Sequence, residues 1–212
     1  KIFTLKQLAD IQSGCLLLAE KFPFQAEMIL MLMFTGRRQP ELSKIRRKNI
    51  KLNERIIVIP ASTHKIRNKD QFITITDPVA MVLDMLDKKK DRVGYEKFKF
   101  IPWLFPTVRF DSSETHDPGY LNSESTKLKS ISNCWNEIRK IKDIWGSPKM
   151  FRKTFSSLAK DTLGSTGKAT KLTGHELDST LDKFYYRTHK DVIIEDADKV
   201  AKIFTFPKVV ND

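Results

Sequence analysis

Four separated segments of the sequence carry side chains that could bind a phosphate group or attack it. In the first, an apolar stretch ends at Thr35-Gly36, and Arg38 lies at the predicted start of the next helix. An arginine at a helix start can hold an anion together with the helix N–H groups nearby. Glu41 lies three residues further along and could hold the guanidinium in place. Taken alone, this pattern is also typical of a surface ion pair.

The second and third segments add further cations. Lys65 lies in a polar turn between two β-rich stretches, where a lysine can reach a phosphate and protonate a leaving oxygen. Lys149 and Arg152 are three residues apart, so they share one face of a predicted helix and could clamp a phosphate. Each segment has a plainer interpretation, a solvated turn lysine in the first case and an ordinary amphipathic helix in the second.

The fourth segment could supply a nucleophile. Gly174 and His175 form a predicted turn from which the imidazole can point into a cleft, and Tyr185 and Tyr186 follow about ten residues later. A phenol can attack phosphorus and form a covalent ester. The alternative is that both tyrosines pack in the core.

Hydrophobic periodicity and capping residues predict the elements that must position these side chains. A capped helix is predicted to start at Thr4, and Ser147 with Pro148 forms a good N-cap and N1 pair for a helix over 149–163. β-branched residues over 50–76 predict a small antiparallel sheet with a basic hairpin turn. Further helices are predicted over 24–34, from residue 39, and over 78–86, 128–141, 168–172, 181–186 and 193–203, with a long loop over 106–127. The fold class is therefore α+β, mainly α-helical, with a small antiparallel sheet near the N-terminal third.

Composition and charge favour a nucleic-acid partner. The 212 residues hold 38 Lys and Arg against 26 Asp and Glu, and the resulting net charge of +12 points to a polyanion. A hydrophobic content of 40% excludes a disordered tail. The two cysteines exclude a disulfide framework and favour an intracellular protein. No apolar stretch approaches the roughly 18 residues of a membrane span, so no membrane partner is expected.

Read in order, the four segments resemble the catalytic domain of the tyrosine recombinases, the phage-integrase family. The family has a T-G-x-R-x-x-E-L motif, a lysine in a β-hairpin turn, an H/K-x-x-R motif, a G-H turn and a tyrosine near the C-terminus. The matching residues are Thr35, Gly36, Arg38, Glu41 and Leu42, then Lys65, then Lys149 and Arg152, then Gly174 and His175, then Tyr185. The stretch Ile59-Pro60-Ala61 before His64-Lys65 also resembles integrases of the P4 phage type. The resemblance covers residues 4–204.

Two features depart from the family pattern. Lys149 stands where the family usually has a histidine, and a lysine can still donate hydrogen bonds to a phosphate. The family's usual spacing of nine residues from the histidine falls on Phe184 rather than on a tyrosine. We favour Tyr185 as the nucleophile because Tyr185-Tyr186-Arg187 resembles the family's Y-x-R/H pattern. Tyr186 stays open as the alternative nucleophile.

The resemblance implies a site-specific DNA recombinase that cuts and rejoins DNA through a 3′-phosphotyrosine intermediate. Arg38 and Arg152 would hold the non-bridging phosphate oxygens, and Lys65 would protonate the leaving 5′-oxygen. Lys149 and His175 would add hydrogen bonds, with His175 helping to deprotonate Tyr185, and Glu41 would orient Arg38 rather than react. No cofactor and no metal are expected, since the arginines supply the charge that a divalent ion would bring.

DNA and further copies of the chain are the expected partners. Basic clusters expected to bind phosphates without reading sequence are Arg46, Arg47 and Lys48, then Arg67 and Lys69 beside Lys65, then Lys88, Lys89 and Lys90. The resemblance also implies a homotetramer on double-stranded DNA, with an accessory DNA-bending protein as a further partner. The expected setting is the cytoplasm of a prokaryotic host, where the enzyme would integrate or excise a mobile element.

The expected domain organisation has two parts. Residues 1–187 form the catalytic domain, and 188–212 form a C-terminal segment that docks on a neighbouring protomer or packs on its own chain. The family's N-terminal core-binding domain is expected to lie outside this fragment. Alternatives are a type IB topoisomerase or telomere resolvase, which use the same chemistry, and an inactive DNA-binding module of the same fold. A metal-dependent nuclease is disfavoured because the sequence has no compact Asp/Glu cluster.

Overall fold

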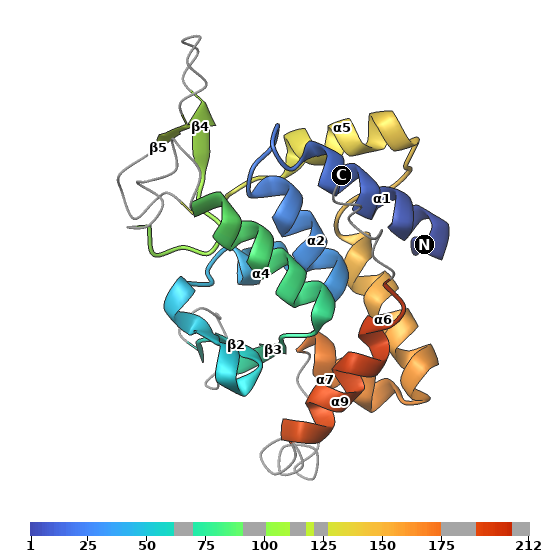
Figure 1. Ribbon diagram of the computed structural model, residues 1–212. Helices are drawn as coiled ribbons and strands as arrows, with labels where there is room; N and C mark the ends of the chain where they lie inside the picture. Colours follow the sequence, from blue (N-terminus) through green and yellow to red (C-terminus); the bar gives the residue numbers. More distant parts are fainter. Residues whose placement is uncertain (62–69, 91–100, 111–117, 121–126, 175–189, 205–212) are drawn as a thin grey trace, which may run out of the picture.

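The computed structural model describes residues 1–61, 70–90, 101–110, 118–120, 127–174 and 190–204 (Figure 1). The helices are α1 (Leu5–Leu18), α2 (Gln25–Thr35), α3 (Gln39–Leu42), α4 (Asp77–Lys90), α5 (Ser132–Lys142), α6 (Met150–Leu163), α7 (Thr166–Thr173) and α9 (Lys190–Ala201), with the short 3₁₀ turns η1 (Arg47–Asn49) and η2 (Leu52–Glu54). The strands are β1 (Ile50–Lys51), β2 (Ile56–Ile59), β3 (Gln71–Thr74), β4 (Val108–Phe110) and β5 (Pro118–Tyr120). Within these ranges, no helix combines the length and hydrophobicity of a membrane span.

Helix α2 is the centre of the hydrophobic core. Its residues 26–35 are all buried, as expected for a helix that is apolar on every side. It packs against α1, α4, α5 and α6, and Figure 1 shows α4 running beside it. Phe151, in the first turn of α6, packs into this core against two aromatic rings. Its ring centroid lies 5.1 Å from that of Phe3 and 5.5 Å from that of Trp135. The core therefore fixes both the C-terminal end of α2 and the start of α6.

The predicted small antiparallel sheet is present, with the strand order β1-β2-β3. Ile57 pairs with Ile73, and Ile59 pairs with Gln71 at the end of the β2–β3 ladder. The buried side chains of Ile57, Ile59 and Ile73 attach the sheet to the helical core. This pairing fixes both ends of the segment that carries Lys65.

The structure differs from the predicted elements at several places, and α4 continues to Lys90 instead of ending at 86. The predicted helix over 181–186 lies outside the described residues. The predicted loop over 106–127 contains the paired strands β4 and β5, because Val108, Phe110 and Tyr120 are good strand formers within an otherwise turn-rich stretch. Helix α5 begins at Ser132 rather than at 128, since the Leu128 N–H donates to the Phe105 carbonyl and holds the chain extended there. Helix α6 begins at Met150 with Lys149 as its N-cap, after a turn that starts at Ser147.

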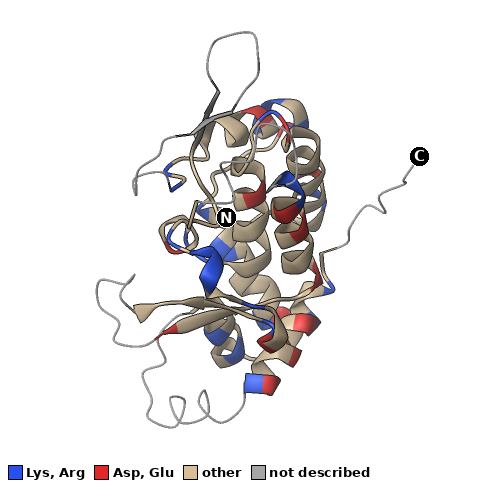
Figure 2. Ribbon diagram, turned by 60° about the vertical axis from the view of Figure 1, so that its left-hand side comes forward, with Lys and Arg blue, Asp and Glu red and all other residues tan. Residues whose placement is uncertain are grey.

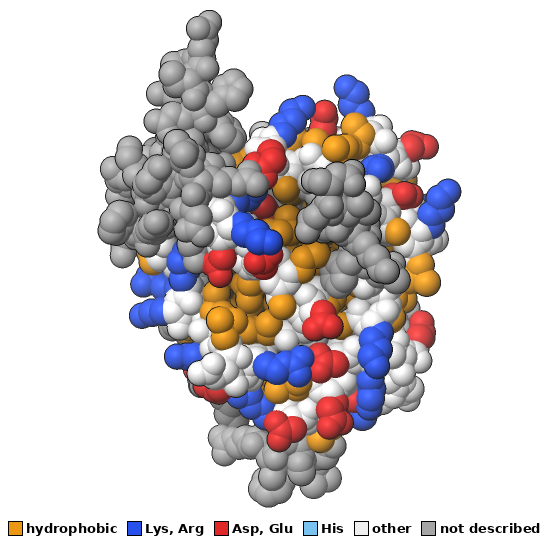
Figure 3. Space-filling model, in the orientation of Figure 1, with side chains coloured by type: hydrophobic (Ala, Val, Ile, Leu, Met, Phe, Trp, Pro, Cys, Tyr) orange, Lys and Arg blue, Asp and Glu red, His pale blue; other side chains and the backbone are white. Residues whose placement is uncertain are grey.

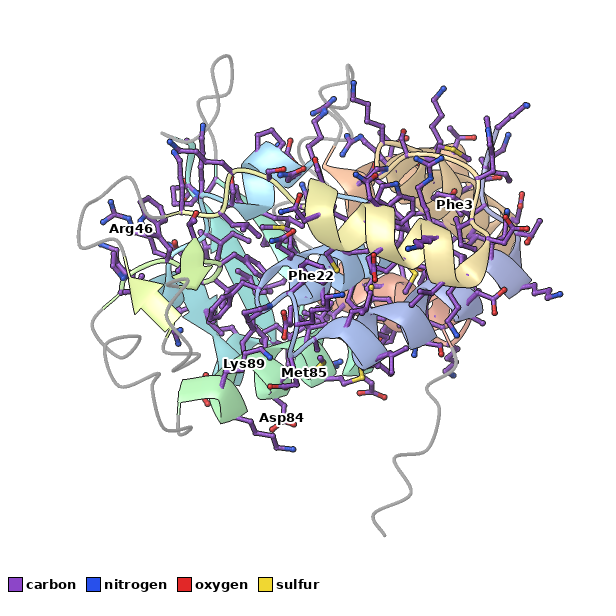
Figure 4. The ribbon with its side chains drawn as sticks, turned by 90° about the horizontal axis from the view of Figure 1, so that it is seen from above. Phe3, Phe22, Arg46, Asp84, Met85 and Lys89 are labelled. Atoms are coloured by element: carbon purple, nitrogen blue, oxygen red, sulfur yellow. The ribbon has the colours of Figure 1, made fainter. Side chains whose placement is uncertain are left out.

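A buried ion pair joins α2 to α4. The Lys89 ammonium lies 3.0 Å from the Glu27 carboxylate and donates to the Ala19 carbonyl. Burial raises the pKa of Glu27, and the charge of Lys89 offsets only part of that effect. The sequence suggests that Lys89 belongs to a basic surface cluster, but only 3% of it is exposed. Figure 4 shows Lys89 directed into the molecule and Asp84 of the same helix directed outward.

Helix α9 packs on its own chain. Ile193, Val200 and Phe204 are buried, and the Phe204 ring meets Phe34 of α2 edge-on at 5.2 Å between centroids. Its outer face forms two ion pairs with the β1–β2 connection, Arg55 with Asp198 at 2.9 Å and Lys190 with Glu54 at 2.7 Å. The described part of the C-terminal segment is therefore anchored in its own chain at both ends.

Candidate active site

Three of the predicted phosphate-binding residues line one cleft. Arg38, Lys149 and Arg152 surround a cavity of about 430 Å³ between the end of α2 and the start of α6. Its other lining residues are Leu32, Arg37, Gln39, Pro40 and Pro148. The fold thus brings together cations that lie more than a hundred residues apart in the sequence. A cleft lined by one sign of charge concentrates anions.

Arg38 is held at a helix start. Helix α2 ends at Gly36, whose φ of +60° turns the chain, and Arg38 then forms the N-cap of α3. The Glu41 carboxylate accepts a hydrogen bond from the Arg38 backbone N–H at 3.3 Å and another from its guanidinium at 3.2 Å. The Arg38 side chain is 51% exposed, against 10% for Glu41. Glu41 therefore orients a guanidinium that stays accessible from solvent.

The charge state of Glu41 fits this orienting role. Burial alone would raise the pKa of its carboxyl group, but the charges of Arg37 and Arg152 and the hydrogen bonds from Arg38 outweigh burial. The pKa of Glu41 is consequently lowered. Glu41 is therefore an anion at neutral pH and unsuited to act as an acid there.

Arg152 is oriented by the backbone. It lies in the first turn of α6, and its Nη1 donates to the Gly36 carbonyl at 3.0 Å and to the Thr173 carbonyl at 2.9 Å. Two carbonyls from different segments hold one nitrogen, while the guanidinium also lines the cleft. Lys149 lies three residues earlier, at the N-cap of α6. The two backbone contacts of Arg152 suit a cation that receives an anion in a fixed position.

The close approach of α2 and α6 depends on Gly36. A Cβ at this position would lie 2.8–2.9 Å from atoms of the buried Phe155 side chain, and φ is +60°. Gly36→Ala is expected to lower the free energy of unfolding by about 2–3 kcal/mol, as left-handed strain and overpacking add. Urea unfolding measures this decrease. Gly164→Ala is the matched control, because Gly164 has a similar φ of +62° and nothing within 4 Å. Equal decreases in both variants would contradict the packing argument.

Arg37 is a cleft residue that sequence patterns did not reveal. It is 1% exposed, and its guanidinium donates to the Gln71 side chain and to the Phe72 carbonyl, both at 2.6 Å. The recombinase motif assigns a role only to the second arginine of the Arg37-Arg38 pair. The first arginine therefore resembled an ordinary surface cation in the sequence.

Several predicted residues lie outside the described ranges. They are Lys65, Arg67, Lys69, His175, Tyr185 and Tyr186. Of the described residues next to them, Gln71 and Gly174 contact the cleft residue Arg37, and α9 follows the tyrosines in the sequence. Gly174 lies against the Arg37 guanidinium, since a Cβ there would overlap it.

The three residues of the predicted basic cluster over 46–48 have different environments. Lys48 is exposed and Arg46 is partly exposed. The Arg47 side chain is 20% exposed and lies 4.0 Å from Asp87. Burial lowers the pKa of Arg47 to about 10, although the charge of Asp87 acts in the opposite direction, so the side chain stays charged at neutral pH. Among the three, Arg46 and Lys48 are the better placed to meet an external polyanion.

Charge is unevenly distributed over the surface. Figure 2 shows Lys and Arg prevailing in the short segments at its left, whereas both signs mix along the helices at its right. On the face shown in Figure 3, acidic and basic side chains alternate around apolar patches. That face therefore lacks the uniform positive charge of a nucleic-acid interface over its described residues.

No protein-family model matches the chain, and no curated protein matches its sequence. Solved structures match its fold. A lambda integrase in a dimer bound to a COC′ core site matches over 84% of this chain and 59% of its own, with a TM-score of 0.52 and 17% sequence identity. A XerA recombinase matches over 88% and 62%, with a TM-score of 0.53 and 16% identity. A XerH site-specific recombinase bound to its difH substrate matches over 90% and 51%, with a TM-score of 0.56 and 13% identity.

These similarities concern the fold. The chain spans 51–62% of the length of these three solved chains, and the sequence identities are low. They nevertheless agree with the family that the order of the motifs predicted. The mainly helical α+β class and the small antiparallel sheet are confirmed. The chain therefore has the fold of the catalytic domain of the tyrosine recombinases.

Proposed function

We propose that the chain is the catalytic part of a tyrosine-type site-specific DNA recombinase, which integrates or excises a mobile element. The observation that carries this proposal is the cleft in which Arg38, Lys149 and Arg152 converge. Hydrogen bonds orient the two guanidinium groups: Arg38 donates to the Glu41 carboxylate, and Arg152 donates to two backbone carbonyls. The fold supports the same conclusion, because the three solved chains described above are an integrase and two recombinases.

The cleft suits the charge that develops during phosphoryl transfer. A pentavalent transition state at a phosphodiester carries negative charge on its non-bridging oxygens. Arg38 and Arg152 donate charge-assisted hydrogen bonds to these oxygens, and Lys149 adds a third cation. The donors are oriented before the DNA arrives, so little reorganisation is needed at the moment of reaction.

The covalent step conserves the phosphodiester energy. The Tyr185 phenolic oxygen forms a bond to phosphorus, and the bond from phosphorus to the 5′-oxygen breaks. His175 accepts the phenolic proton, and Lys65 donates a proton to the leaving 5′-oxygen. The products are a 3′-phosphotyrosyl bond and a free 5′-hydroxyl. Attack by a 5′-hydroxyl of a partner strand reverses these steps and rejoins the DNA, so no external energy source is needed.

A cation–aromatic cluster beside the cleft supports DNA as the substrate. The Arg46 guanidinium lies 4.9 Å and the Lys127 ammonium 5.7 Å from the centroid of the same Trp103 ring. Neither cation has a carboxylate partner within the part of the chain that the structure describes. Two like charges on one ring repel each other, and a polyanion relieves that repulsion. Figure 4 shows Arg46 at the edge of the molecule.

One hydrogen bond links the chain next to the cluster with a residue of the cleft. The backbone runs from Lys127 to Lys129, whose carbonyl accepts a hydrogen bond from the Gln39 side chain at 3.0 Å. Gln39 itself lines the cleft. DNA with its scissile phosphate in the cleft can therefore place neighbouring phosphates over Arg46 and Lys127.

The double variant Arg46→Gln/Lys127→Gln is expected to weaken duplex binding by a similar factor for every DNA sequence. The slope of log K against log salt concentration should fall in magnitude by about 2, one for each phosphate-binding cation removed. Fluorescence anisotropy with labelled duplexes across a salt series measures both quantities. Lys21→Gln/Lys160→Gln removes the same charge elsewhere and should leave the slope nearly unchanged. A similar fall in both double variants would show that only net charge matters.

Assembly belongs to the same proposal. We expect a homotetramer on double-stranded DNA, aided by an accessory DNA-bending protein, in the cytoplasm of a prokaryotic host. The solved lambda integrase is a dimer on its core site, which supports assembly on DNA for proteins of this fold. No cofactor is expected for the reaction.

Covalent selection tests the proposed function without knowledge of the target site. A pool of nicked duplexes of randomised sequence is incubated with the 212-residue chain in EDTA, and protein–DNA adducts are recovered from a denaturing gel and sequenced. The proposal predicts an adduct that resists EDTA, carries its DNA through a 3′-phosphate and becomes enriched for one sequence. Duplex binding without any adduct would favour the inactive DNA-binding module of the same fold. Adducts with relaxation of supercoiled DNA and no strand exchange would favour a topoisomerase.

A further inference from the structure

Arg37 joins three chain segments through one buried side chain. Its guanidinium donates to the Gln71 side chain and to the Phe72 carbonyl at 2.6 Å. The same Nη1 that donates to Gln71 lies against Gly174, where a Cβ would overlap it. Its own backbone connects the end of α2 to Arg38. Only 1% of the residue is exposed, and yet it lines the cleft.

The first contact lies at the base of the segment between β2 and β3. Gln71 is the first residue of β3 and pairs with Ile59, the last residue of β2. Arg37 therefore binds β3 at its first residue, where the β2–β3 ladder ends and the chain arrives from the segment with Lys65. A shift of this strand end relative to the cleft would also shift the attachment point of the segment that contains Lys65.

The second contact lies at the end of α7. Gly174 is the C-cap of that helix, with φ of +69° and its N–H donating to carbonyls of the last turn. His175 follows directly. Since the Arg37 guanidinium occupies the space that a side chain at 174 would need, it sets how closely this helix end approaches the cleft.

Burying an arginine side chain in the core is energetically unfavourable. Desolvation of a guanidinium is unfavourable, and an apolar side chain of similar volume often replaces a buried charge without a decrease in stability. An apolar side chain cannot donate to Gln71 and Phe72 from one planar group. Arg37 is therefore better explained as a residue that holds these two groups in place than as one that raises the free energy of unfolding.

We propose that Arg37 is a positioning residue that holds the base of the β2–β3 connection and the end of α7 in register with the cleft. The inference rests on the function proposed above, because the groups so positioned are the predicted general acid Lys65 and the predicted hydrogen-bond donor His175. Arg37 acts through these segments, because its guanidinium donates to Gln71 and Phe72 and only 1% of the residue is exposed. Displacement of a catalytic group by about 1 Å costs up to about 10²-fold in rate.

The test compares two leaving groups at one scissile phosphate. A duplex recovered by covalent selection is made with the normal 5′-oxygen and with a bridging 5′-sulfur, which leaves as a thiolate and needs no general acid. Single-turnover cleavage of both is measured for wild type, Lys65→Ala and Arg37→Met. Arg37→Met is expected to cleave the oxygen substrate about 10- to 100-fold more slowly and to recover most of that rate with sulfur. Gln71→Met should show a smaller decrease with the same recovery.

The other results separate the two proposals. If sulfur restores Lys65→Ala but neither Arg37→Met nor Gln71→Met, Arg37 does not position the acid and the inference is wrong. If sulfur fails to restore Lys65→Ala, the proposed role of Lys65 is wrong, and with it this inference. Arg37→Lys keeps the charge but cannot bridge the two segments, so it should behave like Arg37→Met. Should Arg37→Met unfold, the Gln71→Met result decides by itself.

Discussion

Tyr185→Phe is expected to abolish the covalent protein–DNA adduct completely. Phenylalanine lacks the oxygen that forms the bond to phosphorus, so the ester cannot form at this position. Duplex affinity and its salt dependence should stay as in wild type, since phosphate contacts come mainly from cations. Denaturing gels with the selected nicked duplex measure the adduct, and anisotropy measures binding on the same preparation.

Tyr186→Phe is the matched control, with the same atom removed one residue away. It should form the adduct at nearly the wild-type rate. Loss of the adduct in Tyr186→Phe alone would keep the mechanism and move the nucleophile by one residue. Loss in neither variant would exclude both tyrosines and overturn the phosphotyrosine mechanism for this chain.

The second large effect is expected at Arg152. Arg152→Ala should slow single-turnover cleavage by about 10²–10³-fold, the typical effect of removing one donor to a charged transition state. Its guanidinium lines the cleft, and carbonyls of Gly36 and Thr173 hold it in place. The affinity for intact duplex should change much less, because the ground-state phosphate carries less charge than the transition state.

Lys153→Ala provides the comparison for Arg152. Lys153 is exposed on the same turn of α6 and does not line the cleft. It should cleave at close to the wild-type rate. Thermal unfolding of both variants checks that the fold of Arg152→Ala stays intact without the two hydrogen bonds to the Gly36 and Thr173 carbonyls. Equal cleavage by Arg152→Ala and wild type would remove Arg152 from the proposed chemistry.

Local sequence patterns predicted most of the fold. Helix α2 was evident from an unbroken apolar stretch, and the sheet from the β-branched residues that pair as Ile57 with Ile73. The strands β4 and β5 were missed because three-residue strands are too short to show a period. Lys88 and Lys89 show a different limit: adjacent lysines look alike in sequence, but one pairs with Asp84 at the surface and the other with buried Glu27.

The site was predictable only in part. The spacing of Lys149 and Arg152 predicted that they share one helix face. That they lie close to Arg38 could be predicted only from the family resemblance. Arg37 shows why neighbouring residues can be misread. One backbone step separates it from Arg38, but Arg37 is 1% exposed and the Arg38 side chain is 51% exposed. Burial of a long cation follows from tertiary contacts that no local pattern contains.

The anchoring of α9 bears on the kinetics of the first strand cut. The described residues on either side of 175–189 are both held in the same chain: Gly174 lies against Arg37, and Lys190 pairs with Glu54. In the proposed reaction the nucleophile therefore belongs to a segment whose two flanking residues are anchored in the protomer that binds the phosphate. Its effective concentration is then set by the length of the tether, on the order of millimolar for short connections. The first cut should accordingly be first order in the protein–DNA complex, and protein concentration should matter only for occupancy and for assembly.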